Sequence, residues 1–161
     1  MSVRFTLDAG DLDDAIVRLR PLFDFEPASL MEAIAALGES QTRRRIESEK
    51  AAPDGTPWQE NLEGTPILRR TGRHLLDSVA SYATGDEAVW GAGWEHAHVH
   101  QDGMTIVPKA AGKLAFKVAG NFVMADEVTI PARPFVGISE DNQSEIVDLV
   151  TDYLGLGGMA K

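Results

Sequence analysis

Hydrophobic residues recur at helical spacing in the second quarter of the chain and predict one long helix there. One face of this helix carries Leu30, Ile34, Leu37 and, two turns later, Ile46. Steps of three and four residues place these side chains on one stripe, which a globular fold buries. Gly38 lies within the helix at a cost of about 1 kcal/mol relative to alanine, so it marks either a bend or the close approach of another element.

The two ends of this helix differ in character. Ser29 followed by Glu32 is typical of a capping box, so the helix is expected to begin at Ser29. Residues 41–50 are almost wholly polar and include three consecutive arginines, Arg43-Arg44-Arg45. A polar helix end of this kind is expected to project into solvent or toward a partner, with the arginines forming a solvated face.

Shorter elements are predicted on both sides of the long helix. Apolar and polar residues alternate over 3–7, which is typical of a half-buried strand. A short helix is expected over 11–20, because Pro21 ends it. A final helix follows its cap at Ser139, has Gly155 as its C′ residue, and is expected to bury Ile146, Val150 and Tyr153.

The middle of the chain is rich in strand and turn signals. Two pairs of segments flank glycine-containing turns and predict β-hairpins: 78–84 with 87–92 across Gly85-Asp86, and 114–118 with 121–125 across Ala119-Gly120. A further strand is expected at 128–130. Residues 104–113 have little to bury and are expected to form a loop that is mobile in the isolated subunit and becomes ordered on assembly. A short helix is expected after Thr71-Gly72, with the side chains of Leu75, Leu76 and Val79 facing the core.

Together these elements predict an α+β fold. A small antiparallel sheet built from hairpins is expected to pack against one long helix and two or three short ones. With 161 residues, 43% of them hydrophobic, the chain has enough material for one core. We therefore expect a single domain over residues 1–155 and a frayed C-terminal tail over 156–161.

Composition excludes several classes of chemistry. The chain has no cysteine, so disulfides, thiolate catalysis and iron–sulfur clusters are ruled out. Because its apolar runs stay well below the ~18 residues of a membrane span, no membrane partner is expected. The N-terminal residues lack the apolar centre of a signal peptide, which places the protein in a cytoplasm or in a particle assembled there.

Charge is abundant and unevenly distributed. The formal net charge of −10 argues against binding nucleic acid through general attraction to phosphates. Residues 75–103 carry five acids and no lysine or arginine, whereas residues 41–74 carry seven bases. A protein with such patches can meet a partner through complementary electrostatic fields.

Three alternating histidines, His96, His98 and His100, are the strongest candidate for chemistry. In a strand they would share one face and could bind zinc, with Glu95 and Asp102 nearby, as in a small metal-dependent enzyme. In a helix, His96 and His100 would share a face and His98 would point away. The alternative to metal binding is an amphipathic segment whose histidines form local hydrogen bonds.

Other catalytic and cofactor motifs are missing from the sequence. It has no Gly-x-Ser-x-Gly elbow, and the glycine-rich 155–158 has no helix after it to form a phosphate loop. We therefore expect no catalytic or cofactor-binding residues. Proline-bearing segments instead present side chains that anchor protein interfaces, namely Trp58, Arg133 and Phe135. This favours an assembly protein, with a general partner-binding module, such as an adaptor or toxin–antitoxin domain, as a further alternative.

A series of short motifs stands in the order found in one known family. They are Arg45-Ile46-Glu47, Pro53-Asp54-Gly55-x-x-Trp58, Ile67-Leu68, Thr71-Gly72, His96-Ala97-x-x-His100-Gln101-x-Gly103, Pro108-Lys109, Leu114-Ala115-Phe116 and Val128-x-Ile130-Pro131-Ala132-Arg133-Pro134-Phe135-x-Gly137. Over about residues 30–155 the chain resembles the phage virion morphogenesis family, the tail completion proteins of tailed bacteriophages and prophages.

The resemblance implies a structural role in the virion, without catalysis or cofactor. Such proteins are expected to act late, in tail completion or head–tail joining, as ring-forming homo-oligomers that contact tail-tube or head–tail connector subunits and are assembled in the host cytoplasm. The family usually has an aromatic residue where this chain has His96, and it does not fix His98, which weakens the zinc hypothesis. The structural or interface residues that it implies are Pro53, Asp54, Gly55, Trp58, His100, Gln101, Gly103, Pro131, Arg133, Pro134 and Phe135.

Two of these residues carry specific expectations. Trp58 should be buried against Leu68 and Leu75 or the hairpins. Arg133 either pins its own loop, through an acid of the His100–Asp102 turn, or reaches an acidic surface on a neighbouring subunit. We favour the pin, because Ala132 and Phe135 are expected to face inward. The acidic residues 75–103 and the basic residues 41–74 are candidates for the two faces of a ring joint.

Overall fold

The computed structural model describes residues 13, 16–69, 74–110 and 112–157. The strand expected at 3–7 and much of the helix expected over 11–20 lie outside these residues, although 16–19 are helical. The helices are the 3-10 turn η1 (Arg20–Leu22), α2 (Pro27–Arg44), the π-helical turn η2 (Arg45–Glu49), α3 (His74–Asp77), α4 (Ala97–Asp102) and α5 (Glu140–Tyr153). The strands are β1 (Val79–Ala83), β2 (Ala88–Ala92), β3 (Met104–Ile106), β4 (Leu114–Val118), β5 (Asn121–Ala125) and β6 (Val128–Ile130).

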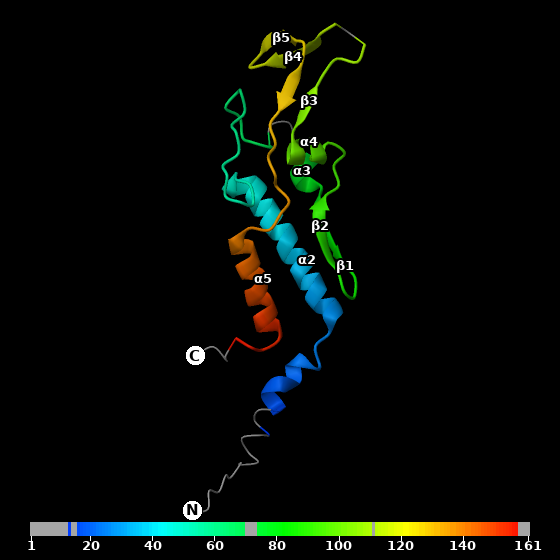
Figure 1. Ribbon diagram of the computed structural model, residues 1–161, viewed down its shortest axis with the longest axis vertical. Coiled ribbons are helices and arrows are strands. Elements are labelled where there is room, and N and C mark those ends of the chain that lie inside the picture. The colour runs from blue at the N-terminus through cyan, green and yellow to red at the C-terminus, as the bar shows by residue number, and fades with distance from the viewer. Residues whose placement is uncertain (1–12, 14–15, 70–73, 111, 158–161) are drawn as a thin grey trace, which may run out of the picture.

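The long helix α2 is the spine of an elongated molecule (Figure 1). α5 runs beside it in the opposite direction, and the β1–β2 hairpin packs along another side. The other strands lie beyond the C-terminal end of α2, and residues 16–25 lie beyond its N-terminal end. The predicted α+β class, with one long helix, is confirmed. Across the described ranges, no helix combines the length and apolar character that crossing a membrane requires.

The described strands form three antiparallel pairs, β1–β2, β4–β5 and β3–β6. Both predicted hairpins are confirmed, with Val79 opposite Ala92 in the first and Leu114 opposite Ala125 in the second. Ala119 and Gly120 both have positive φ, as a tight two-residue hairpin turn requires. The mobile loop expected over 104–113 is wrong for its first residues, because β3 pairs with β6, a strand distant in sequence.

The N-terminal end of α2 differs from the prediction. The helix begins at Pro27, which suits a first helical position because proline has no amide hydrogen to satisfy. Ser29 therefore lies inside the first turn, where its hydroxyl donates to the Glu26 carboxylate, and the predicted capping box is absent. Gly38 marks a close approach, because a Cβ there would lie only 2.3 Å from the nearest ring carbon of Trp90 on β2.

The final helix is capped at both ends as predicted. The Ser139 hydroxyl accepts from the Asn142 amide, and the Asn142 side chain accepts from the Ser139 amide. At the other end, Gly155 has a φ of 66° and the Leu156 amide reaches the Thr151 carbonyl, which forms a Schellman motif. The expected burial of Tyr153 is wrong: its ring is exposed, and its hydroxyl donates to the Glu26 carbonyl at 3.2 Å.

The hydrophobic core lies where the C-terminal end of α2 meets the loops and short helices. It is formed by Ile46, Trp58, Leu75, Leu76, Val79, Ala97 and Phe135. Ile67 and Leu68 pack against this cluster from the rim. The predicted burial of Trp58 and the inward position of Leu75, Leu76 and Val79 are confirmed.

Candidate functional site

An irregular segment between β6 and α5, Pro131–Gly137, is contacted by several segments that are distant in sequence. Its backbone forms neither helix nor strand, so its amides and carbonyls need partners from elsewhere. Side chains distant in sequence supply them, namely Arg45, Trp58 and Gln101. We call Pro131–Gly137 the hub segment.

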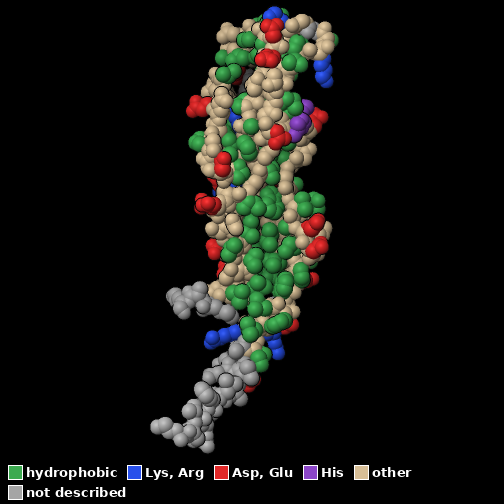
Figure 2. Space-filling view, in the orientation of Figure 1, with side chains coloured by type: hydrophobic (Ala, Val, Ile, Leu, Met, Phe, Trp, Pro, Cys, Tyr) green, Lys and Arg blue, Asp and Glu red, His purple; other side chains and the backbone are tan. Residues whose placement is uncertain are grey.

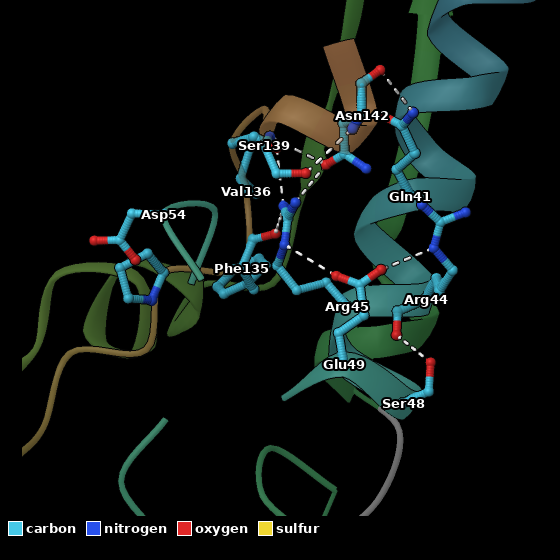
Figure 3. A network of polar contacts seen from close by, with 12 residues as sticks. Gln41, Arg44, Arg45, Ser48, Glu49, Asp54, Phe135, Val136, Ser139 and Asn142 are labelled. Carbon is cyan, nitrogen blue, oxygen red and sulfur yellow. Dashed lines mark hydrogen bonds and ion pairs between the residues drawn. The ribbon is translucent and has the colours of Figure 1, made fainter. Parts of the chain in front are cut away.

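Arg45 joins the hub segment to two helices. It is only 1% exposed, and its Nη1 donates to the carbonyls of Phe135 at 3.1 Å and Gly137 at 2.8 Å. Its Nη2 donates to the Asn142 side-chain oxygen at the start of α5 (Figure 3). Burial lowers the pKa of the guanidinium, while Glu49, 3.6 Å from Nε, acts in the opposite direction. One buried cation thus fixes α2, the hub segment and α5 together.

The expectation that residues 41–50 project into solvent or toward a partner is wrong for Gln41 and Arg45, whereas residues 47–49 are exposed. Gln41, like Arg45, is buried, and it donates to the Asn142 carbonyl at 3.2 Å and to the Glu145 carboxylate at 2.7 Å. This hydrogen bond from Gln41 is the main cause that lowers the pKa of Glu145. The physical reason for the burial is that α5 packs against this end of α2 and offers polar partners to a polar face.

The other bases near this helix end also bond within the chain. Arg43 donates to the carbonyls of Leu76 and Val79, at 3.0 and 2.5 Å. Arg44 forms ion pairs with Glu49 and Glu145. Lys50 donates to the carbonyls of Ile46 and Ile67. The solvated arginine face is therefore also wrong: these cations tie loops and helices to α2.

The loop from Pro53 to Trp58 closes over one side of the hub segment. The Trp58 indole donates through Nε1 to the Pro134 carbonyl at 3.2 Å. A Cβ on Gly137 would collide with the Pro53 ring, so the two segments touch. Asp54 and Gly55 form the turn: the Asp54 carboxylate accepts from the Thr56 amide, which lowers its pKa, and Gly55 has a φ of 83°.

Gln101 and Gly103 hold the hub segment from another side. The Gln101 carbonyl oxygen accepts from the amides of Phe135 and Val136, both at 3.1 Å, and its Nε2 donates to the Val136 carbonyl at the same distance. Gly103 has a φ of 73°, and a Cβ there would lie 2.8 Å from the Ala132 nitrogen. Only glycine fits this conformation and this approach without strain.

Arg133 is buried at 5% exposure and bonds to its own chain. Its Nε and Nη2 donate to the Gln59 carbonyl at 3.0 and 2.8 Å, and Nη2 also reaches the Asn61 side-chain oxygen at 3.1 Å. These partners are neutral, so an acid of the His100–Asp102 turn, as suggested from the sequence, is not what it contacts. Ala132 is exposed, contrary to expectation, whereas Phe135 is buried.

The three alternating histidines lie on or beside a helix, so the arrangement of a strand with one shared face is wrong. His98 is exposed on α4, and His96 and His100 both contact the ring of Trp94. The His100 ring stacks on the Trp94 indole, with the two ring centroids 5.8 Å apart. No three histidines or acids among the described residues are grouped so that they could hold a metal ion.

A cavity of about 440 Å³ adjoins the hub segment. Its lining includes Leu68, Trp94, His100, Phe116 and Arg133. The His100 Nδ1 is buried without a hydrogen-bond partner in the described part of the chain. Burial, followed by the nearby Arg133 charge, lowers the pKa of His100 and favours the neutral ring. A hydrolytic triad would require a carboxylate on this nitrogen, and the described residues place none there.

Sequence reasoning missed three participants. They are Gln41 and Arg45, whose polarity suggests solvent or a partner, and Asn142, which no sequence pattern singles out. A signal was present: Gln41 and Arg45 lie seven and eleven residues after Ile34 and so continue the predicted apolar stripe of α2.

Taken together, these contacts define an α+β protein in which the motif residues hold an irregular backbone segment in place. The comparison with known families agrees with this: residues 7–155 match the phage virion morphogenesis family. Because the match covers most of the 161 residues, the chain belongs to the phage virion morphogenesis family.

A curated relative supports the same assignment. The chain is 27% identical over 132 residues to "Mu-like prophage FluMu G protein 2" of Haemophilus influenzae, a match that covers 80% of this chain and 79% of the relative. No solved structure matches the chain significantly. The protein is thus a virion morphogenesis protein with a prophage homologue.

Proposed function

We propose that this protein is a structural subunit of a tailed phage or prophage that acts in tail completion or head–tail joining as a ring-forming homo-oligomer. Its expected partners are tail-tube or head–tail connector subunits, its location is the virion, and it is assembled in the host cytoplasm. In this proposal residues 1–155 act as one unit, and the protein has no enzymatic role.

One observation carries the proposal beyond family membership. The N-terminal half of α2 and its surroundings expose large hydrophobic side chains, including Phe23 at 82% and Val147 at 55%. Figure 2 shows a continuous band of hydrophobic side chains over this half of the molecule, between α5 and the β1–β2 hairpin. Contiguous apolar surface of this kind marks protein association sites.

The motif residues support an assembly role in a different way. Trp58, Gln101 and Arg133 satisfy backbone groups of their own chain, so they fix the shape of the subunit. The basic residues Arg43, Arg44 and Lys50 are likewise engaged internally. The proposed ring joint therefore does not use the basic 41–50 stretch and relies on apolar surface instead.

The test is deletion of the gene from an inducible prophage that carries it. Induced lysates should then contain separate heads and tails, or tails of abnormal length, and the infectious titre should fall by orders of magnitude. A plasmid copy of the wild-type gene should restore the titre. Normal joined particles in the absence of the gene would contradict the proposed function.

A further inference from the structure

Residues 16–25 carry apolar side chains that the other described residues leave largely exposed. Ile16, Leu19 and Phe23 follow one another at helical spacing and are 52%, 45% and 82% exposed. Together with Arg20 and Asp24 they surround a shallow hollow. The segment lies beyond the N-terminal end of α2, away from the body of the molecule (Figure 1). We call residues 16–25 the arm.

The body has a second apolar surface that is only partly covered. Val147 of α5 is 55% exposed, and Met31 and Ile34 of α2, Trp90 of β2 and Val150 of α5 are half-buried. α2 contacts both α5 and β2, and Figure 2 shows a band of hydrophobic side chains over the region where these elements lie. We call these five residues the apolar strip.

The charges of the two surfaces are complementary. The arm carries two bases, Arg18 and Arg20, and one acid, Asp24, next to its apolar residues. α5 carries five acids and no lysine or arginine, and Asp86 and Glu87 lie in the turn of the β1–β2 hairpin. Figure 2 shows acidic side chains along both edges of the band and basic side chains at its arm end. A basic, apolar segment is therefore suited to this acidic-edged strip.

We propose that the arm of one subunit docks on the apolar strip of a second copy of this chain. The arm projects from one end of the body and the strip lies along its side, so the joint is head-to-tail and uses two different surfaces. Repetition of such a joint closes a ring when the rotation between neighbours permits it. This inference rests on the proposed ring assembly and assigns its interface.

Cross-linking between single-cysteine variants tests the docking, since the chain has no cysteine of its own. Leu19→Cys and Val147→Cys replace exposed side chains, so both variants should fold, which circular dichroism checks. Mixed and treated with a short bis-maleimide, they should give mainly the cross-linked heterodimer. Phe122→Cys is the matched control for Val147→Cys, because it is 65% exposed on β5 at the opposite end of the molecule and should not react with Leu19→Cys.

Each other outcome overturns the inference. Cross-linking within one chain of the Leu19→Cys/Val147→Cys double variant at high dilution would show that the arm folds back on its own strip. Mainly Leu19–Leu19 cross-links would show a symmetric contact between arms, and equal reaction with the Phe122→Cys control would show nonspecific encounter. If particles require the gene but the heterodimer does not form, the arm inference fails and the proposed function stands.

Charge reversal provides an independent measurement. Arg18→Glu/Arg20→Glu should lower the heterodimer yield at a fixed concentration by about tenfold or more, because acids would then face acids. Lys109→Glu/Lys117→Glu makes the same change in net charge at the other end of the molecule and should leave the yield within about twofold. Equal losses for the two pairs would mean that net charge alone controls association, which contradicts docking on the strip.

Discussion

The two ends of α2 use their side chains in opposite ways. At the C-terminal end, the polar side chains of Gln41 and Arg45 are buried and bond to other segments. In residues 16–25, which precede the N-terminal end of α2, apolar side chains such as Phe23 are exposed. Among the described residues, one region is therefore fully packed and the other leaves apolar surface exposed. We interpret the C-terminal end of α2 as the part that fixes the fold, and residues 16–25 as the part that binds a neighbouring copy.

The largest loss of stability is expected from a substitution at Arg45. Arg45→Met would leave the carbonyls of Phe135 and Gly137 without their donor, and we expect the free energy of unfolding to fall by about 3–5 kcal/mol. Arg44→Met is the matched control: its side chain is 42% exposed, so its ion pairs should contribute less than about 1 kcal/mol. Urea denaturation measures both variants, and similar losses would contradict the special role of Arg45.

A comparably large effect is expected at Trp58, which contributes both apolar packing and a hydrogen bond. Trp58→Ala should cost about 3–5 kcal/mol of stability, because it opens a cavity in the core. Trp58→Phe keeps an aromatic ring but loses the donor to the Pro134 carbonyl, so its cost should be smaller. If thermal denaturation shows that Trp58→Ala melts like the wild type, the residue serves an interface and not the core.

Features with local sequence signals could be predicted, and features that depend on distant partners could not. The hairpins and the caps of α5 were predictable because their signals are local, as at Ala119-Gly120 and Ser139. The burial of Gln41 was not, because its partners lie 101 and 104 residues away and polarity alone suggests solvent. The strand β3 escaped prediction for the same reason, since only its pairing with β6 defines it.

In the candidate site, too, local motifs could be recognised but distant contacts could not be predicted. The residues of the hub segment and its partners, such as Trp58 and Gln101, could be selected from their motifs, but their roles could not. The Gln101 side chain acts through three bonds to a backbone that has no regular structure, and only the fold brings that backbone to it. Nothing local in the sequence showed that Arg133 would select the neutral oxygens of the 59–61 loop.

A smaller change in the free energy of unfolding is expected for Gly38→Ala, and its sign shows whether Trp90 packs closely on the helix. Helix propensity alone predicts that Gly38→Ala stabilises the protein by about 1 kcal/mol. The added methyl would collide with the Trp90 ring, so we expect a net loss of about 1–3 kcal/mol. Ser40→Ala, on the exposed side of α2, should be neutral or slightly stabilising. A stabilised Gly38→Ala in chemical denaturation would show that the hairpin does not pack closely on the helix.

The dependence of stability on pH should reveal the buried ring of His100. Because burial lowers its pKa in the folded state, the unfolded chain binds the proton more readily once the pH falls below about 6.5. Stability is thus fully present above that pH and lost below it, with a slope of at most about 1.4 kcal/mol per pH unit for one proton. The lowered pKa values of Glu39 and Glu145 act only at more acidic pH.

The His100 contribution is isolated by substitution. His100→Gln should flatten the loss of melting temperature between pH 7.5 and 5.5, whereas His98→Gln, an exposed control on the same helix, should leave it as in the wild type. An unchanged pH profile in His100→Gln would show that the ring is accessible to protons in the folded state.

The smallest effect on stability is expected in the arm. Phe23→Asp replaces a side chain that is 82% exposed, so the free energy of unfolding should change by less than about 0.5 kcal/mol. Self-association, measured by sedimentation at several concentrations, should nevertheless be lost. A destabilised monomer would mean that Phe23 packs within its own chain.

Amide hydrogen exchange on the free subunit and on assembled particles distinguishes a segment that is fixed within the subunit from one that is fixed by a neighbour. We predict that the amides of Arg133, Phe135 and Val136 are already protected in the free subunit and change little on assembly, because their acceptors belong to the same chain. Residues 16–25 should exchange rapidly in the free subunit and become protected in the particle. A hub segment that gains protection only on assembly, or an arm that is equally protected in both states, would contradict the account.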